Sequence, residues 1–301
     1  MCAAFRLEGR MGRWRAWSAG MLLAAALLPA ARAGCSRPIV APASALGKMV
    51  VVDKDSGAVS GIYPELLREQ GRKAGCTFDF PVVPRARAEL MLRTGQADLL
   101  LGATAGPERL RWGDYIPMVG TEWRLVSKVG TTPPSSVVAL TAMPGIRFNA
   151  VRGFNYGAAY QAMLAALDRR GDLELVADAQ VVAAKMLAGR ADYTYMPSNT
   201  FVGALEALGL DKAHRAVFQY TRLDGIASST SGVYLSKKLA PADARQVAAV
   251  LLALRANNSL LARARAVYTP QEMSSIFPLP ASLPALSSRP QQPVRQVVQG
   301  D

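Results

Sequence analysis

Residues 75–118 read GCTFDFPVVPRARAELMLRTGQADLLLGATAGPERLRWGDYIPM. The apolar run at 78–83 predicts a strand, the amphipathic segment after it predicts a helix, and the apolar run at 99–101 predicts a second strand. Gly95 supplies the turn between the helix and the second strand. Such a unit is typical of an open α/β sheet, in which ligands bind beyond the carboxyl ends of the strands.

Three residues of this stretch, Thr104, Gly106 and Arg109, fall beyond the end of the second strand. An arginine at such a place suits a carboxylate, because the guanidinium fork can donate two parallel hydrogen bonds to it. We therefore expect Arg109 to bind an acidic group of a ligand. The alternative is a structural ion pair between Arg109 and Glu108 or Asp114.

Four segments resemble, in the same order, sequences of the extracytoplasmic solute-binding proteins of family 3, which serve amino-acid-type ABC importers. They are GIYPELLREQGRKAGC (61–76), the T-x-x-P-E-R pattern that follows ADL (104–109), GRADYTYMPSNT (189–200) and YLSKK (234–238). The resemblance covers roughly residues 37–277. It implies an α/β fold of the periplasmic-binding-protein type 2, a two-lobed clamshell with two crossover strands. It also implies a monomer that binds a small-molecule carboxylate ligand and has an ABC permease of the inner membrane as its partner.

The same resemblance implies roles for individual residues. In the family the arginine of the motif binds the α-carboxylate of the ligand, and this role falls on Arg109. The first threonine of the family pattern is present as Thr104, whereas Gly106 replaces the second and removes one hydroxyl. The acid that usually binds the ligand's amino group stands five residues after the aspartate of GRAD, where this chain has Pro197. An anionic ligand is therefore implied without the usual ammonium contact, and Tyr195 or an aromatic face is an alternative contact for a zwitterion.

A second anion contact is predicted in VRGFNYGAAY, residues 151–160. A glycine-containing turn that opens a helix presents unpaired N–H groups and the positive end of the helix dipole to an anion. The candidates are Gly153, Phe154, Asn155 and Tyr156. An ordinary asparagine-containing helix start is the alternative.

Further candidates lie near the expected cleft: two arginines that open a helix and several aromatic residues. They are Arg85, Arg87, Tyr63, Trp112, Tyr115, Trp123 and Tyr195. The two arginines are secondary anion contacts or else solvated side chains. One or two of the aromatic residues would wall the ligand, and packing in the core is the alternative for each of them.

Residues 1–33 have the pattern of an export signal. Four arginines precede an apolar core at 21–31, and Ala31-Arg32-Ala33 provides a small-x-small cleavage site. The core is shorter than the about 20 residues that span a bilayer. We therefore expect a cleaved signal peptide and a periplasmic protein. A short membrane anchor and lipidation at Cys35 are the alternatives.

Removal of this signal leaves two cysteines, Cys35 and Cys76, in an oxidising compartment. Cys35 precedes the first expected strand and Cys76 begins the second, so neighbouring strand starts would bring the two within bridging distance. We expect a Cys35–Cys76 disulfide, and two unpaired buried thiols are the alternative.

The remaining chain is expected to form two lobes and a tail. Lobe 1 comprises residues 34–124 and 223–277, and lobe 2 comprises residues 125–222. The tail, residues 278–301, is rich in Pro, Ser and Gln and is expected to be disordered. Alternating strand and helix signals predict a mostly parallel sheet. The apolar spacing at 242–266 predicts one long helix.

Composition limits the other functions. The formal net charge is +13, and loss of five arginines and one glutamate with the signal lowers it to +9. The charges are spread along the chain with no basic block among aromatics, so no nucleic-acid partner is expected. His214 is the only histidine, which argues against a histidine-dependent triad or a multi-histidine zinc site. With no nucleotide- or metal-binding motif either, no catalytic residue, metal or cofactor is expected.

These observations favour a periplasmic solute-binding protein that captures a small carboxylate-bearing, amino-acid-like solute for an ABC importer, and they do not favour an enzyme. Two alternatives stay open. The same fold hosts periplasmic lyases of the cyclohexadienyl dehydratase type, and a soluble ligand sensor would signal through a partner.

Overall fold

The computed structural model describes residues 34–53, 55–210, 216–226, 229–268, 270, 273, 276 and 277. The expected signal peptide (1–33), the expected tail (278–301) and His214 lie outside these residues. In the described part of the chain, no helix is both long enough and apolar enough to cross a membrane.

One set of strands, here called the first strand group, includes the strands of residues 75–118, the stretch from which the fold was predicted. It consists of β1 (Ile39–Val40), β4 (Phe78–Asp79), β5 (Leu99–Thr104), β6 (Gly113–Thr121) and β12 (Ser229–Ser236). The β1–β4 pair is parallel, and β12 lies between β5 and β6, antiparallel to both. The N–H of Asp98 donates to the carbonyl of Val40 at 2.8 Å, which joins the start of β5 to β1. A short hairpin, β2 (Val51–Val52) and β3 (Val59–Ser60), precedes the first helix.

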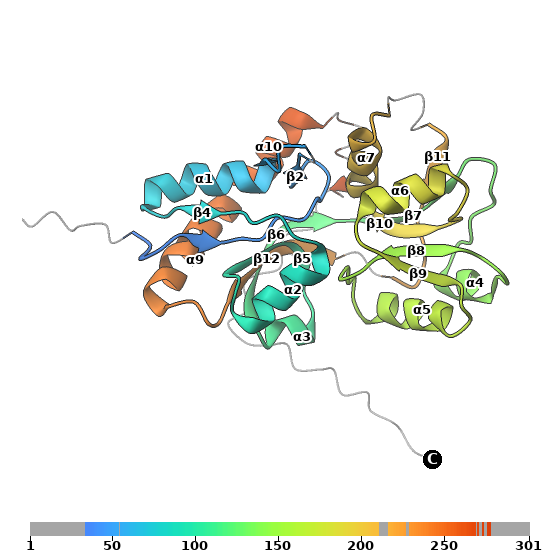
Figure 1. The fold of residues 1–301 in the computed structure, drawn as a ribbon, viewed down its shortest axis with the longest axis horizontal. Coiled ribbons are helices and arrows are strands. Elements are labelled where there is room, and N and C mark those ends of the chain that lie inside the picture. Colours follow the sequence, from blue (N-terminus) through green and yellow to red (C-terminus); the bar gives the residue numbers. More distant parts are fainter. Residues whose placement is uncertain are drawn as a thin grey trace, which may run out of the picture. The chain divides into compact units, whose positions relative to one another are not determined.

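Several helices with described bounds belong to this part of the chain. They are α1 (Ile62–Ala74), α2 (Arg85–Thr94), α3 (Pro107–Leu110), α9 (Pro241–Ala256) and α10 (Ser259–Val267). Helix α1 packs against α9 and α10, whereas α2 packs on β5 (Figure 1). Both α1 and α2 end at a glycine in the left-handed conformation, Gly75 at φ 71° and Gly95 at φ 79°. Glycine is favoured there because it has no Cβ to clash with the backbone.

A second strand group holds the middle of the chain. It consists of β7 (Trp123–Lys128), β8 (Phe148–Val151), β9 (Leu173–Val176), β10 (Thr194–Pro197) and β11 (Phe218–Thr221). Strand β7 lies between β10 and β11, antiparallel to both, and β8 pairs in parallel with β9. A bridge between Phe148 and Tyr193 connects the two sets of pairs. The helices here are α4 (Val137–Ala142), α5 (Ala158–Asp168), α6 (Ala179–Leu187) and α7 (Ser198–Ala207) (Figure 1).

The expectation of a mostly parallel sheet holds only in part, because β1–β4 and β8–β9 pair in parallel while β7 and β12 are reversed. Among the described strands, those next to β7 and β12 run antiparallel to them. Strand β6 ends at Thr121 and β7 starts at Trp123, so the chain passes almost directly from one strand group into the other.

Two other segments differ from the sequence-based expectation. The helix expected at 242–266 is divided into α9 and α10, because Asn258 adopts a left-handed conformation with φ 49°. Asparagine tolerates this conformation better than most residues do. The strand expected at 78–83 pairs regularly only over Phe78–Asp79, because Pro81 has no N–H to donate to a neighbouring strand.

The Cys35–Cys76 disulfide is confirmed. The two Cα atoms lie 4.7 Å apart, and the bond closes a loop with a sequence separation of 41. Cys35 precedes β1 and Cys76 precedes β4, and these two strands are parallel neighbours. The bond therefore joins two strand starts, which is the arrangement that the sequence predicted.

Candidate ligand-binding site

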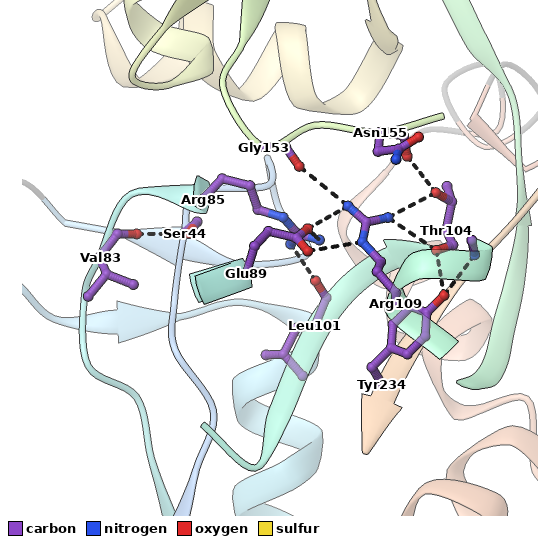
Figure 2. A network of polar contacts seen from close by, with 11 residues as sticks. Ser44, Val83, Arg85, Glu89, Leu101, Thr104, Arg109, Gly153, Asn155 and Tyr234 are labelled. Carbon is purple, nitrogen blue, oxygen red and sulfur yellow. Dashed lines mark hydrogen bonds and ion pairs between the residues drawn. The ribbon is translucent and has the colours of Figure 1, made fainter. Parts of the chain in front are cut away.

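The turn after β5 holds Arg109 at the end of the sheet. Gly106 precedes α3 and Pro107 is its first residue, where proline is favoured because its missing N–H has no helical partner. The N–H of Gly106 donates to the Tyr234 hydroxyl at 2.8 Å, and that hydroxyl donates to the Thr104 carbonyl at 3.1 Å (Figure 2). Tyr234 of β12 thus fixes the turn from below.

Arg109 is only 5% exposed and is held on several sides. Its Nε and Nη2 donate to the two carboxylate oxygens of Glu89 at 3.0 and 2.5 Å. Its Nη1 donates to the carbonyl and to the hydroxyl of Thr104, both at 3.2 Å (Figure 2). Among the described residues the ion-pair partner is therefore Glu89, and not Glu108 or Asp114.

Glu89 also pairs with a second buried arginine. Arg85 opens α2, is 5% exposed and lies one helical turn before Glu89, with 3.4 Å between its Nη2 and Oε1 of Glu89. Its Nη1 donates to the carbonyl of Leu101 at 2.8 Å. Its Nε has no hydrogen-bond partner among the described residues. Burial lowers the pKa of Arg85, with a smaller contribution from the Arg109 charge, while Glu89 acts in the opposite direction. Two guanidinium groups thus share one carboxylate, so the three side chains together keep one net positive charge.

A turn from the second strand group closes over these side chains. The Thr104 hydroxyl donates to the Asn155 carbonyl at 2.5 Å, and Nη2 of Arg109 donates to the Gly153 carbonyl at 3.3 Å (Figure 2). Gly153 has a φ of 89°, and a Cβ there would lie 2.8 Å from the backbone nitrogen of Ala86. Only glycine fits such a close backbone approach.

The contacts of this turn differ in kind from those expected. The sequence suggested free N–H groups at residues 153–156, but helix α5 starts later, at Ala158, after the N-cap Gly157. The Asn155 side chain accepts a hydrogen bond from the Gly157 N–H at 2.9 Å. The turn contacts Thr104 and Arg109 through the carbonyl oxygens of Asn155 and Gly153, which are suited to cations and donors and not to an anion.

Aromatic residues form the opposite wall. Tyr156 stacks on Trp123 with ring centroids 4.9 Å apart, and it also contacts Phe154, Tyr160 and Tyr195. Burial raises the pKa of Tyr156 well above its usual value, so its hydroxyl stays neutral at physiological pH.

Two cavities meet at Arg85 and Phe154, which line both. The inner cavity, of about 60 Å³, is lined among others by Tyr63, Thr104, Arg109, Trp123, Asn155, Tyr156 and Pro197. No Asp or Glu occurs among the described residues that line it. Pro197 is one of its lining residues, so the position of the resembled family's amine-binding acid contributes no charge here.

The lateral cavity has a volume of about 340 Å³. It is lined by segments 43–45, 82–85 and 177–180, with Val52, Asp53, Gly57, Val151 and Phe154.

The structure brings together most of the candidates. Those that line the inner cavity are Arg109, Thr104, Tyr63, Arg85, Trp123, Phe154, Asn155 and Tyr156. Gly106 and Gly153 support them through backbone groups, as described above. Arg87 is exposed and contacts Gln96, and Tyr195 is buried within the aromatic cluster; neither lines the inner or the lateral cavity.

Sequence reasoning missed Glu89. A signal was present, because Arg85 and Glu89 are four residues apart on an expected helix, a spacing at which opposite charges pair. Within the described residues, no group of three or more His, Cys, Asp or Glu side chains is placed to hold a metal ion.

No protein-family model and no curated protein matches this chain. Solved structures do match. A histidine kinase sensor domain with similarity to periplasmic binding proteins aligns with a TM-score of 0.62 and 18% identity, covering 80% of this chain and 97% of that one. An ancestral arginine-binding protein bound to arginine aligns with a TM-score of 0.62 and 14% identity, over 77% and 98% of the two chains. A putative L-cystine ABC transporter protein from Listeria monocytogenes gives a TM-score of 0.59 and 16% identity, over 76% and 94%.

These similarities define the class of the fold, which is that of the periplasmic binding proteins. The predicted α/β fold class is confirmed, and structural neighbours include substrate-binding proteins of amino-acid ABC transporters, as the family resemblance implied. At such identities the likeness concerns the fold, and the ligand has to be argued from the site.

Proposed function

We propose that this protein is a periplasmic solute-binding protein that captures a small carboxylate-bearing solute for an ABC importer. One observation carries the proposal. Two buried arginines, Arg85 and Arg109, share the single carboxylate of Glu89 beside a cavity lined by both strand groups. A buried charge without a counter-charge is costly. A carboxylate of the solute would supply the missing negative charge.

The proposal fits the other features of the chain. The structural neighbours include an arginine-binding protein and a putative L-cystine ABC transporter protein. The Cys35–Cys76 disulfide suits an oxidising compartment, and residues 1–33 would direct export to the periplasm. Binding by a monomer would be the whole of its chemistry. Lobes at 34–124 plus 223–277 and at 125–222 would close on the solute, as domains do around a ligand.

The charges at the site also favour a class of solute. The described lining of the inner cavity includes two arginines and no acid. A solute with a cationic side chain would meet like charge, which costs free energy. We therefore propose that neutral or acidic carboxylates are preferred over arginine, the ligand of one neighbour described above.

A thermal-shift screen tests the proposal. Amino acids, hydroxy acids and dicarboxylates are each compared with the corresponding primary amide, which keeps the shape and removes the charge. A carboxylate at about 100 times its dissociation constant should stabilise the protein by roughly 2.7 kcal/mol, while the amide should not. Equal stabilisation by acids and amides, or none by any acid, would contradict the proposal.

A sensor is the second candidate, because a histidine kinase sensor domain is among the similar structures. Uptake of the stabilising solute by cells lacking this protein separates the two functions. An importer component is required for uptake, whereas a sensor changes the cell's response without changing transport. Incubation with prephenate-like acids checks the lyase alternative, since only an enzyme would convert them.

A further inference from the structure

Two residues from the C-terminal side of the described chain reach the inner cavity. Ile276 and Phe277 lie beyond α10, and they line this cavity with side chains that are 3% and 7% exposed. All other described residues of the lining precede the end of β12. Part of the wall of the cavity that Arg85 and Arg109 line is therefore supplied by a segment that belongs to neither strand group.

Contacts with separate parts of the molecule hold this segment in place. The N–H of Glu122, the residue between β6 and β7, donates to the Ile276 carbonyl at 3.3 Å. The Phe277 ring packs edge-on against Tyr268, with ring centroids 6.4 Å apart. The Tyr268 hydroxyl accepts a hydrogen bond from Nδ2 of Asn199 in α7 at 3.4 Å. The segment is thus fixed both to the link between the strand groups and to a helix of the second group.

The volume of the inner cavity limits what it can hold. It is about 60 Å³, whereas small-molecule sites usually measure about 300–1,000 Å³. A cavity needs about 10–15 Å³ to hold one water, so the inner cavity has room for about four such groups. This is the size of a carboxylate group with one or two carbons attached. A larger solute would overlap with the walls, and overfilling a well-packed interior is unfavourable.

Selection by size has to come from the uncharged walls of the cavity. Arg85 and Arg109 attract the carboxylate of a short acid and of a long acid alike, because they act on its charge. The ring of Phe277 is a bulky part of the uncharged wall. Because Phe277 belongs to neither strand group, shortening it enlarges the cavity and leaves in place the strands and helices that hold the arginines.

We propose that Phe277, together with Ile276, limits the length of the solute, and that the site takes carboxylates of about two or three carbons, such as acetate, glycolate, propionate or lactate. This inference rests on the proposed function and names the class of solute for that same site. Longer acids, most amino acids among them, are excluded because the two C-terminal side chains occupy the volume that their carbon chain would need.

A series of acids of increasing length tests the inference. Acetate, propionate, butyrate, hexanoate and phenylacetate are titrated into wild type and into Phe277→Ala, and calorimetry measures each affinity. Wild type should bind acetate or propionate roughly ten-fold or more tightly than hexanoate and phenylacetate. Phe277→Ala should bind phenylacetate roughly ten-fold or more tightly than wild type does, because an apolar cavity left by a truncated side chain can take up a ring.

Phe80→Ala is the matched control. Phe80 is 8% exposed, packs against the guanidinium of Arg68 and lines neither the inner nor the lateral cavity. This variant should lose stability, as truncation in a core does, and should keep the wild-type order of affinities. If Phe277→Ala fails to fold, Phe277→Leu provides a milder truncation and should bind butyrate more tightly than wild type does.

The outcomes separate the length limit from the proposed function. Three results would overturn the role of Phe277 and leave the proposed function intact: hexanoate bound by wild type as tightly as acetate, an unchanged order of affinities in the Phe277 variants, or the same change of order in Phe80→Ala. Binding of no carboxylate by wild type or by any variant would contradict the proposed function, and the length limit would fall with it.

Discussion

Glu89 holds Arg109 through both of its carboxylate oxygens, at 3.0 and 2.5 Å from Nε and Nη2. Glu89 therefore supplies, from within the chain, the carboxylate that a guanidinium group at the end of a sheet is suited to bind. Glu89 also pairs with Arg85, one turn earlier in α2. The positive charge left for a solute therefore depends on how strongly Glu89 neutralises each of the two arginines.

Glu89→Gln should destabilise the fold strongly. The substitution keeps the side-chain volume but leaves two buried guanidinium groups without a counter-charge, and breaking a buried ion pair costs about 3–5 kcal/mol. Urea unfolding measures the loss. The control is Glu174→Gln, because Glu174 is 53% exposed in its pair with Lys185 and should cost no more than about 1 kcal/mol. Equal losses in the two variants would contradict the central role of Glu89.

Arg109→Ala should weaken binding of the carboxylate found in the screen by about 2–5 kcal/mol, and Arg109→Lys should recover only part of this. Without Arg109, the whole charge of Glu89 neutralises Arg85. The double variant Arg109→Ala/Glu89→Gln should therefore bind more tightly than Arg109→Ala, to within about 1.4 kcal/mol of wild type. Calorimetry on folded variants measures each affinity.

Two results would contradict parts of this account. A double variant as weak as Arg109→Ala would indicate that Arg109 itself contacts the carboxylate. Wild-type affinity in Arg109→Ala would exclude any role for this residue, and attention would turn to Arg85, Arg87 and Arg152.

Reduction of the Cys35–Cys76 bond should lower the free energy of unfolding. In the chain-entropy model a loop of 41 residues corresponds to about 4 kcal/mol. Urea unfolding with and without reductant measures the difference, and Cys35→Ala/Cys76→Ala should show no further effect of reductant. Mass spectrometry of the protein purified without reductant should find two hydrogens missing, and two free thiols would refute the bond.

Asp243 should make stability depend on acid. Its carboxylate accepts hydrogen bonds from the hydroxyl and the backbone N–H of Ser36, at 2.7 and 2.8 Å, and these lower its pKa. A lowered pKa stabilises the fold above the unfolded value of about 3.9, and this stabilisation is lost as the pH falls through the folded value. The drop in stability between pH ~7 and pH ~3 should therefore be smaller in Asp243→Asn than in wild type. The exposed control Asp114→Asn should leave the drop unchanged.

Ligand binding should compact the molecule by hinge closure near Trp123 and Asp224. Few residues need to change their dihedral angles where the chain crosses between lobes. Small-angle scattering with the carboxylate found in the screen should show a smaller radius of gyration. Thr104→Val removes the hydroxyl that bonds the Asn155 carbonyl and should make the closed form less populated. An unchanged radius at saturation in wild type would argue against closure.

Local signals predicted the elements around Arg109 well. Helices α1 and α2 end where the sequence has Gly75 and Gly95, because left-handed C-caps depend on the residue at that place alone. Strand β6 was not predicted, since Pro117 and two glycines interrupt its apolar pattern. Its partner β12 lies more than a hundred residues further along the chain, so the pairing leaves no local signal.

The site was predictable only in part for the same reason. Arg109 stands in a local motif, but its partner Glu89 is 20 residues away in sequence, and their contact depends on how α2 packs on β5. Nε of Arg85 and Oε1 of Gln180 have no hydrogen-bond partner among the described residues. Whether such an atom finds a partner likewise depends on burial and on neighbours from distant segments. No sequence pattern specifies which donors and acceptors stay without a partner.

Gly153 gives the site a mechanical property as well as a chemical one. The backbone of Gly153 lies so close to the backbone of Ala86 that only the hydrogen atom of a glycine side chain fits between them. Any larger residue at 153 would act as a wedge between the turn and the start of α2. Gly153 therefore sets the distance between this turn and the start of α2. A larger residue at position 153 would hold the two segments further apart without changing any charge of the site.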